Sequence, residues 1–467
     1  MLESAVPETF DISKSSQSDE IAELHASCGV YTRADMAGRI LDEIGWKADV
    51  DLSGARLLEP AAGNGIFVVE AASRLLASEL ASGRSLEIER LRERILAFEL
   101  LDDEAASGRK ALRDLLVSQG ISKLQARELA DFWLRTDDFL LQGSTIGRFS
   151  HVAGNPPYAR WSKIPPGLRR RYEEALPKHA AKGDLFLPFL DRGIELLKTG
   201  GRLGFLCSDR WKFMAFAEDF RRRRLPHVEL VLNEPVEAAA VYQRAVDIYP
   251  SLLVLEKRAS AAHARPRERT GKTLEELGFA IRVGPALGCA PAFVLEPGEN
   301  DVETELLAPF LRASDLRNGQ LAYSDRRIIC MHSADGRLLD PANYPRTLRR
   351  LRKFKQKLSN RSIVEKNGAP WYRPIDTVQA DRWAKPKLLV PELSKHPRAV
   401  LDTSGAVPSH GIYAIVPESD DADIEGLAAR LSEDGLFKAV EGLAPMVKGG
   451  YLRCYKSILE QVVIDGG

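Results

Sequence analysis

The stretch that most constrains the fold is a glycine-containing turn between an apolar run and a helical pattern. Residues 55–59 predict a short buried strand, and residues 66 to about 80 predict a long helix. Between them, Gly63 and Gly65 permit a tight turn and let a ligand approach the backbone closely. Two glycines alone are typical of many ordinary turns. A strand, a glycine turn and a helix in this order, however, favour the opening of a doubly wound α/β domain that binds a nucleoside-bearing ligand.

The alternation of strands and helices continues to about residue 258. Further strands are expected at 94–100, 149–153, 201–207, 228–232 and 251–255, with helices at 103–118, 122–133 and 185–197. This alternation predicts a mostly parallel sheet covered on both faces. Residues 21–48 also have helical spacing, with Thr32 as a candidate N-cap.

The chain has 467 residues, which is too long for one ordinary core. Residues 259–275 have the composition of a linker, and after them the regular alternation fades. We therefore expect a first domain over 1–258, with an N-terminal helical segment, and a second over 276–467. The formal net charge is +0, so only a local concentration of charge could indicate a nucleic-acid partner.

The most informative short motif is Asn155-Pro156-Pro157-Tyr158, which directly follows the apolar run 149–153. The prolines fix two φ angles, so the Asn carboxamide and the following carbonyls form a rigid array of acceptors. Such an array suits an exocyclic amino group: Asn155 Oδ1 and the Pro156 carbonyl would accept its two protons, while Tyr158 stacks on the ring. By itself the tetrapeptide also fits a strand-ending turn.

Two acids follow predicted strands. Glu99 ends the second strand, where a carboxylate accepts hydrogen bonds from ribose hydroxyls. Asp138 and Phe139 follow a later strand, and they could receive the amino group and the ring of an adenine. Each also has an ordinary interpretation, as an acid at a strand end or a surface acid beside a core Phe.

The run from Glu59 to Phe67, followed at a distance by Asn155 to Tyr158, resembles the S-adenosylmethionine-dependent DNA adenine-N6 methyltransferases of restriction-modification systems, in their gamma arrangement. The resemblance implies a Rossmann-like methyltransferase sheet followed by a mixed α+β target-recognition domain. It implies S-adenosylmethionine as cofactor, held by Tyr31, Thr32, Glu59, Pro60, Ala61, Gly63, Gly65, Phe67, Glu99, Asp138, Phe139 and Asn155. The sequence departs from the family at Arg33, where the family has Pro, and at 208–211, where it often has a proline.

The resemblance also implies a mechanism of direct methyl transfer to an adenine that has left the helix. The catalytic residues would be Asn155, Pro156, Pro157 and Tyr158, with Tyr242 on the far face of the base so that the two tyrosines sandwich it. Tyr242 could equally be a core aromatic. In the family, Asn or Asp at the first position favours adenine and Ser marks cytosine-N4 enzymes.

Basic residues outnumber acids several-fold between 345 and 398, and aromatic residues are interleaved with them. This pattern predicts phosphate contacts to double-stranded DNA, although any one charge run can be a solvated helix face. The predicted DNA-binding residues are Arg349, Arg352, Lys353, Lys355, Arg361, Trp371, Arg373, Arg382, Lys385 and Lys387. The run 221–224 of four arginines could contact DNA or be a solvated helix end.

Several alternatives remain open on the sequence alone. The Asn-Pro-Pro-Tyr motif also occurs in protein-glutamine and ribosomal-RNA methyltransferases, and a DNA-binding module with an inactive methyltransferase fold is a further class. A separate nuclease or other defence-system partner is possible.

The five cysteines and eight histidines have no metal-ligand spacing, so we expect no metal. No apolar run is long enough to span a bilayer, so we expect a cytoplasmic, nucleoid-associated protein.

Overall fold

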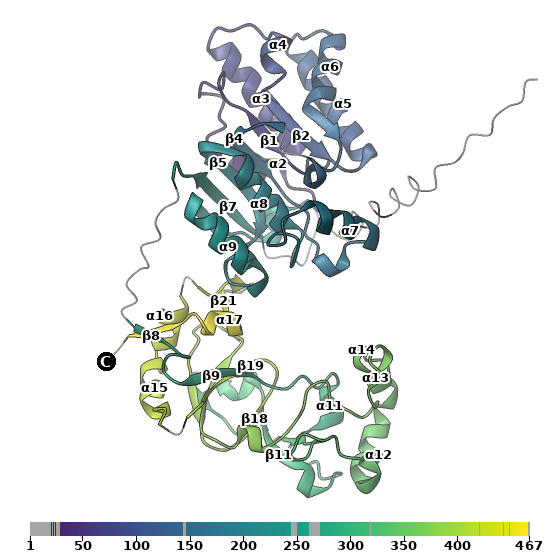
Figure 1. Ribbon diagram of the computed structural model, residues 1–467, viewed down its shortest axis with the longest axis vertical. Coiled ribbons are helices and arrows are strands. Elements are labelled where there is room, and N and C mark those ends of the chain that lie inside the picture. The colour runs from purple at the N-terminus through teal and green to yellow at the C-terminus, as the bar shows by residue number, and fades with distance from the viewer. Residues whose placement is uncertain are drawn as a thin grey trace, which may run out of the picture. The chain divides into compact units, whose positions relative to one another are not determined.

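The computed structural model describes residues 20, 22, 24, 29–142, 146–243, 250–260, 271–317, 319–419, 421–441, 443–447 and 449–465. It divides into two compact units, Met1–Arg265 and Pro266–Gly467 (Figure 1). The division falls within the expected linker 259–275, of which residues 261–270 lie outside the described residues.

Unit 1 is built on a seven-stranded sheet with the order β3-β2-β1-β4-β5-β7-β6. Its strands are β1 (Leu57–Glu59), β2 (Ile95–Glu99), β3 (Leu134–Thr136), β4 (Phe149–Gly154), β5 (Leu197–Ser208), β6 (Val228–Pro235) and β7 (Pro250–Lys257). The first five are paired in parallel, and β7 is antiparallel to both β5 and β6. The expected mostly parallel α/β sheet is confirmed.

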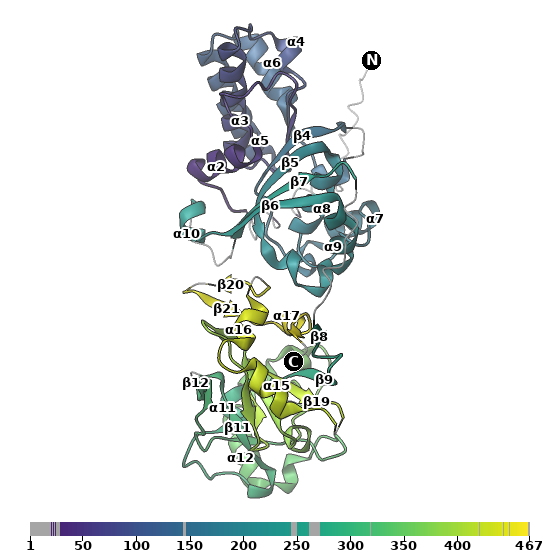
Figure 2. The same cartoon turned by 90° about the vertical axis from the view of Figure 1, so that its left-hand side faces the viewer.

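Successive residues of the central strands pack into two different cores. Leu57 and Val254 belong to one core, whereas their neighbours Leu58 and Leu253 belong to the other. This is the result of the two-residue period of a strand that is buried on both faces. The first core is completed by α2 (Ala34–Ile44), α3 (Ile66–Ala81), α4 (Ile88–Leu91), α5 (Asp102–Ser118) and α6 (Lys123–Trp133). The second is completed by α7 (Pro166–Ala175), α8 (Phe186–Leu196) and α9 (Glu218–Arg224) (Figure 2).

The N-terminal helix is shorter than predicted and starts differently. The segment 29–33 is not helical, and the N-cap of α2 is Arg33 rather than Thr32. Thr32 instead forms an isolated antiparallel bridge with Tyr242, flanked by hydrogen bonds from Arg33 N to Val241 O and from Gln243 N to Tyr31 O. This long-range pairing keeps the backbone extended, so it overrides the local capping preference of Thr.

The glycine turn has the geometry that its sequence predicts. Gly63 and Gly65 have φ of 53° and 89°, a left-handed conformation that favours glycine. A Cβ on Gly65 would lie 2.8 Å from Cα of Gly108 on α5. The turn therefore depends on close backbone approach between two elements distant in sequence.

Unit 2 is a mixed α+β structure with several small sheets around one core. Two four-stranded sheets have the orders β10-β14-β11-β18 and β17-β15-β19-β9. A three-stranded sheet has the order β16-β21-β20. Two further pairs are β22 with β8 and β12 with β13. The strands are β8 (Gly271–Thr273), β9 (Phe279–Val283), β10 (Val294–Leu295), β11 (Leu307–Leu311), β12 (Leu316–Arg317), β13 (Gln320–Leu321), β14 (Arg327–Ile329), β15 (Lys387–Pro391), β16 (Leu393–Ser394), β17 (Val400–Asp402), β18 (Val407–Pro408), β19 (Ile412–Pro417), β20 (Met446–Val447), β21 (Tyr451–Arg453) and β22 (Val463–Asp465). The helices are α11 (Ala290–Phe293), α12 (Pro345–Lys353), α13 (Lys355–Ser359), α14 (Ser362–Glu365), α15 (Ile424–Leu431), α16 (Gly435–Val440) and α17 (Lys456–Leu459).

Two properties of the described residues limit the kinds of site that they can form. None of their helices is both long and apolar enough to cross a membrane. Within the same residues, no group of three or more His, Cys, Asp or Glu side chains is placed to hold a metal ion.

Candidate functional site

A cavity lies at the carboxyl ends of β1, β2, β3 and β4. Parallel strands end at the same edge of a sheet, so the segments that follow them converge there. The cavity is lined by Leu24, Gly29, Val30, Tyr31, Pro60, Ala61, Gly63, Phe98, Glu99, Leu100, Leu101, Asp137, Asp138, Phe139, Asn155, Pro156, Pro157, Tyr158, Tyr172, Leu185 and Phe189. The structure thus brings together the glycine turn, both predicted acids and the Asn-Pro-Pro-Tyr motif.

The Asn155 carboxamide is held by one hydrogen bond. Its Nδ2 donates to the backbone carbonyl of Val30 over 3.0 Å. Its Oδ1 is shielded from solvent and has no hydrogen-bond partner within the described residues. An unpaired buried acceptor is costly, and a ligand that donates a hydrogen bond would remove that cost.

The two tyrosines do not sandwich an open space, which corrects the expectation for Tyr242. The Tyr242 hydroxyl donates to the Tyr158 hydroxyl over 2.8 Å, and Tyr158 donates to the Leu206 carbonyl over 2.8 Å. The rings meet edge to face, with centroids 6.2 Å apart. Only Tyr158 lines the cavity, while Tyr242 is 2% exposed and packs in the core. Tyr242 therefore holds Tyr158 in place, because its backbone is fixed by the bridge to Thr32.

Glu99 joins the second strand to the glycine turn. One carboxylate oxygen accepts from Gly63 N over 2.7 Å, and the other accepts from the N–H groups of Leu100 and Leu101 over 2.9 Å. These bonds fix the carboxylate of Glu99 at the lining of the cavity.

Glu59 is completely buried beside this site, behind the wall of the cavity. Its oxygens have no hydrogen-bond partner of standard geometry within the described residues, although the Val68 N–H lies near enough to lower its pKa slightly. Burial and, second, the negative charge of Glu99 raise the pKa of Glu59 well above its usual value. Both causes favour the protonated, neutral form of the Glu59 carboxyl group.

Three more expected cofactor residues lie outside the cavity lining. Phe67 is on α3 and packs in the first core, and Thr32 is buried in the bridge to Tyr242. Gly65 is the N-cap of α3. In this structure the three residues shape the turn and its surroundings, and their contact with a ligand stays a prediction.

The far wall of the cavity combines an acid with aromatic rings. Asp138 accepts from Tyr172 Oη and from Leu140 N, each over 2.9 Å, and burial raises its pKa. Phe139 is stacked on Phe189 with ring centroids 5.6 Å apart. Tyr172 and Phe189 were not predicted, because helices α7 and α8 bring them to the cavity over long sequence separations.

Opposite this wall, Tyr31 lies against the glycine turn. Its hydroxyl donates to Glu104 Oε1 on α5 over 2.5 Å, and a Cβ on Gly63 would lie 3.4 Å from its ring. Val30, which holds Asn155, is its immediate neighbour. The segment 30–32 therefore connects the glycine turn, the Asn155 amide and the tyrosine pair.

In unit 2, two of the expected DNA-contacting residues are structural. Arg361 is 8% exposed and donates to four backbone carbonyls, those of Leu358, Leu287, Trp371 and Arg373. Lys387 is fully buried and its Nζ lies 2.6 Å from Oδ2 of the equally buried Asp402. Neither side chain can reach a phosphate, which corrects both expectations.

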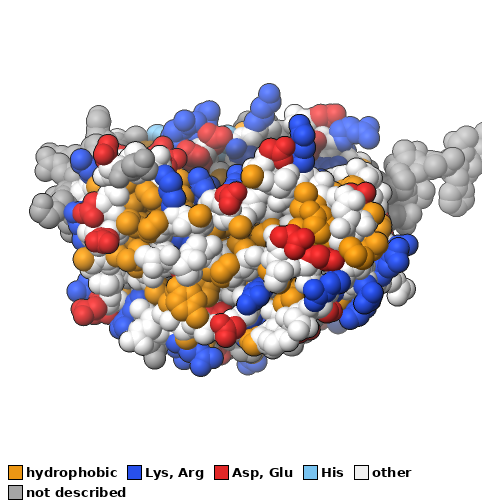
Figure 3. All heavy atoms as spheres, turned by 90° about the horizontal axis from the view of Figure 1, so that it is seen from below, with side chains coloured by type: hydrophobic (Ala, Val, Ile, Leu, Met, Phe, Trp, Pro, Cys, Tyr) orange, Lys and Arg blue, Asp and Glu red, His pale blue; other side chains and the backbone are white. Residues whose placement is uncertain are grey.

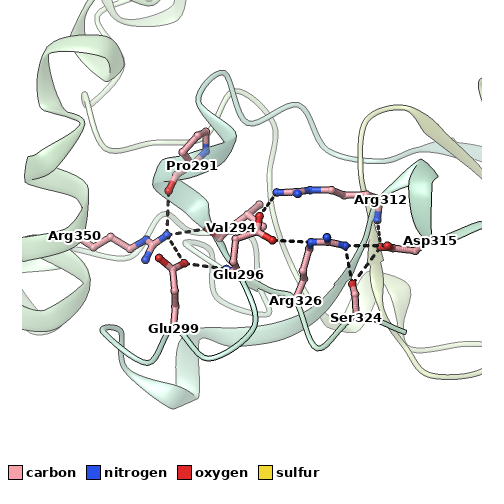
Figure 4. Close-up of polar contacts among 9 residues, drawn as sticks. All are labelled: Pro291, Val294, Glu296, Glu299, Arg312, Asp315, Ser324, Arg326 and Arg350. Atoms are coloured by element: carbon pink, nitrogen blue, oxygen red, sulfur yellow. Dashed lines mark hydrogen bonds and ion pairs between the residues drawn. The ribbon is translucent and has the colours of Figure 1, made fainter. Parts of the chain in front are cut away.

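The helix α12 is attached to the rest of unit 2 by another buried arginine. Arg350 donates to the carbonyls of Pro291 and Val294 and to the carboxylate of Glu299 (Figure 4). It also donates to the carboxylate of Asp301. The neighbouring Arg326 bridges Glu296 and Asp315 in the same network. These contacts turn the opposite face of α12 outward.

Exposed basic side chains lie on α12 and in the segments that follow it. Arg349, Arg352, Lys353 and Lys355 are exposed, as are Arg382 and Lys385. Lys353 lies 3.4 Å from Asp301, and Lys355 lies over the Trp371 ring at 5.6 Å. Trp371 and Arg373 are half-buried. Basic and acidic side chains are interspersed on the face seen in Figure 3.

Two residues of the run of four arginines are held in the fold of unit 1. Arg221 donates to the carbonyls of Trp211 and Met214, and Arg224 pairs with the buried Asp191. Arg222 is exposed and pairs with Asp219.

Comparison with known proteins identifies the relatives of this fold. Residues 10–229, nearly half of the chain, match the family described as Eco57I restriction-modification methylase. The chain is 28% identical to the type II methyltransferase M.PaeR7I of Pseudomonas aeruginosa, over 94% of this chain and 86% of that protein. It is 26% identical to the type II methyltransferase M.XhoI of Xanthomonas vasicola, over 93% of this chain and 90% of that protein.

Among solved structures, the type IIL restriction-modification enzyme MmeI, determined in complex with DNA, resembles this chain with a TM-score of 0.59. The match covers 95% of this chain and 67% of MmeI, at 13% identity. The expected resemblance to restriction-modification methylases is thus confirmed, and unit 1 has the fold of S-adenosylmethionine-dependent methyltransferases.

Proposed function

We propose that this chain, which carries an Eco57I restriction-modification methylase domain, transfers a methyl group from S-adenosylmethionine to N6 of an adenine extruded from duplex DNA. The match to the restriction-modification methylase family and the likeness to MmeI, whose structure was determined in complex with DNA, support DNA as the substrate. The observation that carries the reaction type is the amide of Asn155: its Nδ2 is fixed on the Val30 carbonyl, which leaves the shielded Oδ1 as an unpaired acceptor.

Two acceptors that hold an amino group make it a better nucleophile. Asn155 Oδ1 and the Pro156 carbonyl would each accept a hydrogen bond from the amino group. The nitrogen lone pair would then be less delocalised into the ring and available for attack. Tyr158, held by Leu206 and Tyr242, would stack on that ring. Orientation of the reacting groups supplies most of the rate enhancement, because all these groups are fixed before the substrate arrives.

The cavity fits a nucleoside-bearing cofactor. Glu99 would accept from ribose hydroxyls, Asp138 would accept from the adenine amino group, and Phe139 would pack on the adenine ring. Tyr31 and Gly63 would border its methionine part. When bound, S-adenosylmethionine would supply the electrophilic methyl group: its methyl–sulfur bond would break as the bond to N6 forms, S-adenosylhomocysteine would leave, and one N6 proton would be lost to solvent. The DNA phosphates would be contacted by the exposed basic residues of unit 2, of which Arg349, Arg352 and Lys355 are the clearest.

Incubation of the protein with mixed-sequence duplex DNA and labelled S-adenosylmethionine, followed by mass spectrometry of the nucleosides, tests this proposal. We expect N6-methyladenine. N4-methylcytosine would overturn the base assignment but keep the reaction. Transfer to RNA or to a protein glutamine instead of DNA would overturn the substrate.

A further inference from the structure

Tyr172 reaches the unit 1 cavity from a helix that carries none of the predicted motifs. It lies on α7, is 2% exposed and lines the cavity. Its ring belongs to the second core, and its centroid lies 6.3 Å from that of Trp161. Its hydroxyl group donates to the carboxylate of Asp138. Tyr172 therefore joins a fixed apolar ring to a polar group in the wall of the cavity.

The carboxylate of Asp138 is held by two different elements. Tyr172 Oη donates to Oδ2 and the N–H of Leu140 donates to Oδ1, each over 2.9 Å. The bond from Leu140 fixes one oxygen relative to the turn that Asp138 begins. The bond from Tyr172 fixes the other oxygen relative to α7. Because both oxygens are held, the orientation of the carboxylate in the cavity wall is set.

Opposing effects act on the charge of Asp138. Burial raises the pKa of its carboxyl group, and the hydrogen bond from Tyr172 is the largest effect that lowers it. The N–H groups of Leu140 and Leu141 and the positive charge of Arg171 act in the same direction as Tyr172. Loss of the phenol hydroxyl would therefore raise the pKa of Asp138 further.

The other charged groups near Asp138 do not replace Tyr172. Arg192 of α8 attracts the charge of Asp138, but its Nη1 is engaged with a backbone carbonyl over 2.9 Å. Asp137 and Glu99 also line the cavity, and as acids they cannot favour a second negative charge. The phenol of Tyr172 is thus the neutral donor on which the ionised form of Asp138 depends most.

We propose that Tyr172 is a positioning residue that sets the preference of the cavity for a cofactor with an adenine ring. Its hydroxyl group orients the Asp138 carboxylate and keeps it ionised. An ionised carboxylate only accepts hydrogen bonds, which suits the 6-amino group of adenine and opposes the 6-carbonyl group of hypoxanthine. A protonated carboxyl group could donate to that carbonyl group instead. The inference rests on the proposed function, since it takes Asp138 as the acceptor of the cofactor amino group.

The pH profile of binding tests the effect of Tyr172 on charge. S-adenosylhomocysteine, the demethylated cofactor, is titrated calorimetrically into the full chain without DNA from pH 5 to pH 8. Affinity should fall as the pH drops through the pKa of Asp138, because the protonated group presents a donor to the amino group. In Tyr172→Phe, which keeps the buried ring, the midpoint of this fall should lie higher by about one pH unit or more, since the charged form loses a hydrogen bond.

The choice of ring is tested with S-inosylhomocysteine, the hypoxanthine analogue of the same compound. The wild type should prefer the adenine compound by about 100-fold or more, because a carboxylate beside a carbonyl group leaves both acceptors unpaired. In Tyr172→Phe at pH 6 this ratio should be lower by at least about tenfold, because more of Asp138 is protonated and can donate to the carbonyl group.

Tyr323→Phe is the matched control. Tyr323 donates to Asp402 over 3.0 Å in unit 2, so this variant also loses a bond between a phenol and a carboxylate, whereas the cavity is lined by residues of unit 1. It should leave the pH profile and the ratio unchanged.

Asp138→Asn tests whether Tyr172 acts through Asp138. The carboxamide does not ionise, so the fall in affinity at low pH should disappear, which separates the titration of Asp138 from that of Asp137 and Glu99. Addition of Tyr172→Phe to this variant should change the affinity by no more than about twofold, because the charge that the phenol stabilised is gone.

The outcomes separate this inference from the proposed function. A Tyr172→Phe protein with the wild-type midpoint and ratio would overturn the positioning role, as would a wild type that binds both compounds equally. If Tyr172→Phe does not fold, Asp138→Asn decides: a fall in affinity that persists in it overturns the inference, and one that disappears supports it. These titrations contain no DNA. A wild type that discriminates as expected but forms no N6-methyladenine would overturn the proposed function alone.

Discussion

The carboxyl group of Glu59 lies under the glycine turn without the partners that a buried charge needs. Burial and the neighbouring Glu99 raise its pKa in the folded protein well above the usual value of 4.5. In the unfolded chain the group ionises near that usual value. Between the two pKa values the unfolded state has released a proton that the folded state still holds, so rising pH lowers the free energy of unfolding.

We therefore predict that Glu59→Gln removes a pH-dependent loss of stability. The measurement is urea unfolding of both proteins without cofactor. The free energy of unfolding of the variant minus that of the wild type should increase from pH 5 to pH 8. The expected increase is up to about 4 kcal/mol, because one proton linked to unfolding contributes about 1.4 kcal/mol for each of the three pH units. A constant difference between the two proteins over this range would show that Glu59 is ionised in the fold.

At the scale of elements, the glycine turn and α5 are fitted to one another. The Cα of Gly108 would be 2.8 Å from a Cβ on Gly65, whose φ is also positive. Nearby, Glu99 accepts from Gly63 N, so a shift of the turn would also disturb that contact.

We predict that Gly65→Ala destabilises unit 1 by about 1–3 kcal/mol or more, from backbone strain plus the clash with Gly108. It should also weaken S-adenosylmethionine binding in calorimetry. Gly120→Ala is the control for strain alone, because Gly120 has φ of 86° but nothing within 4 Å of a Cβ. Equal effects of the two substitutions on cofactor binding would contradict a specific role for the Gly65–Gly108 contact.

The elements of unit 1 could be predicted from the sequence because their signals are local. Helix α3 begins at Ile66 directly after the turn, and β4 ends at the Asn155 motif as expected. The extended segment at Thr32 and the hydrogen bond between Tyr158 and Tyr242 could not be predicted, because their partners are 210 and 84 residues away in sequence and nothing local specifies them.

At the scale of the whole molecule, local charge density indicated a basic segment but not which side chains remain exposed. Arg361 folds back on four carbonyls, whereas Arg352 is exposed on α12. Burial is decided by packing between segments distant in sequence, as Lys387 and Asp402 also illustrate.

This difference predicts opposite effects for two similar substitutions. Arg352→Gln should weaken duplex binding, with a salt slope smaller by about 0.9, and leave thermal stability unchanged. Arg361→Gln should lower the stability of unit 2 by about 3 kcal/mol or more, because several buried carbonyls lose their charged donor. Calorimetric melting together with salt titrations checks both. A loss of stability in the Arg352 variant would contradict the assignment.

The central claim is that the Asn155 amide holds the reacting amino group in the unit 1 cavity. Single-turnover methyl transfer to duplex DNA, compared between the wild type and Asn155→Ala with saturating S-adenosylmethionine, tests it most directly. We predict a rate lower by about 100-fold or more in the variant, with little change in the cofactor dissociation constant. A variant that transfers methyl groups within a few-fold of the wild-type rate would contradict the account.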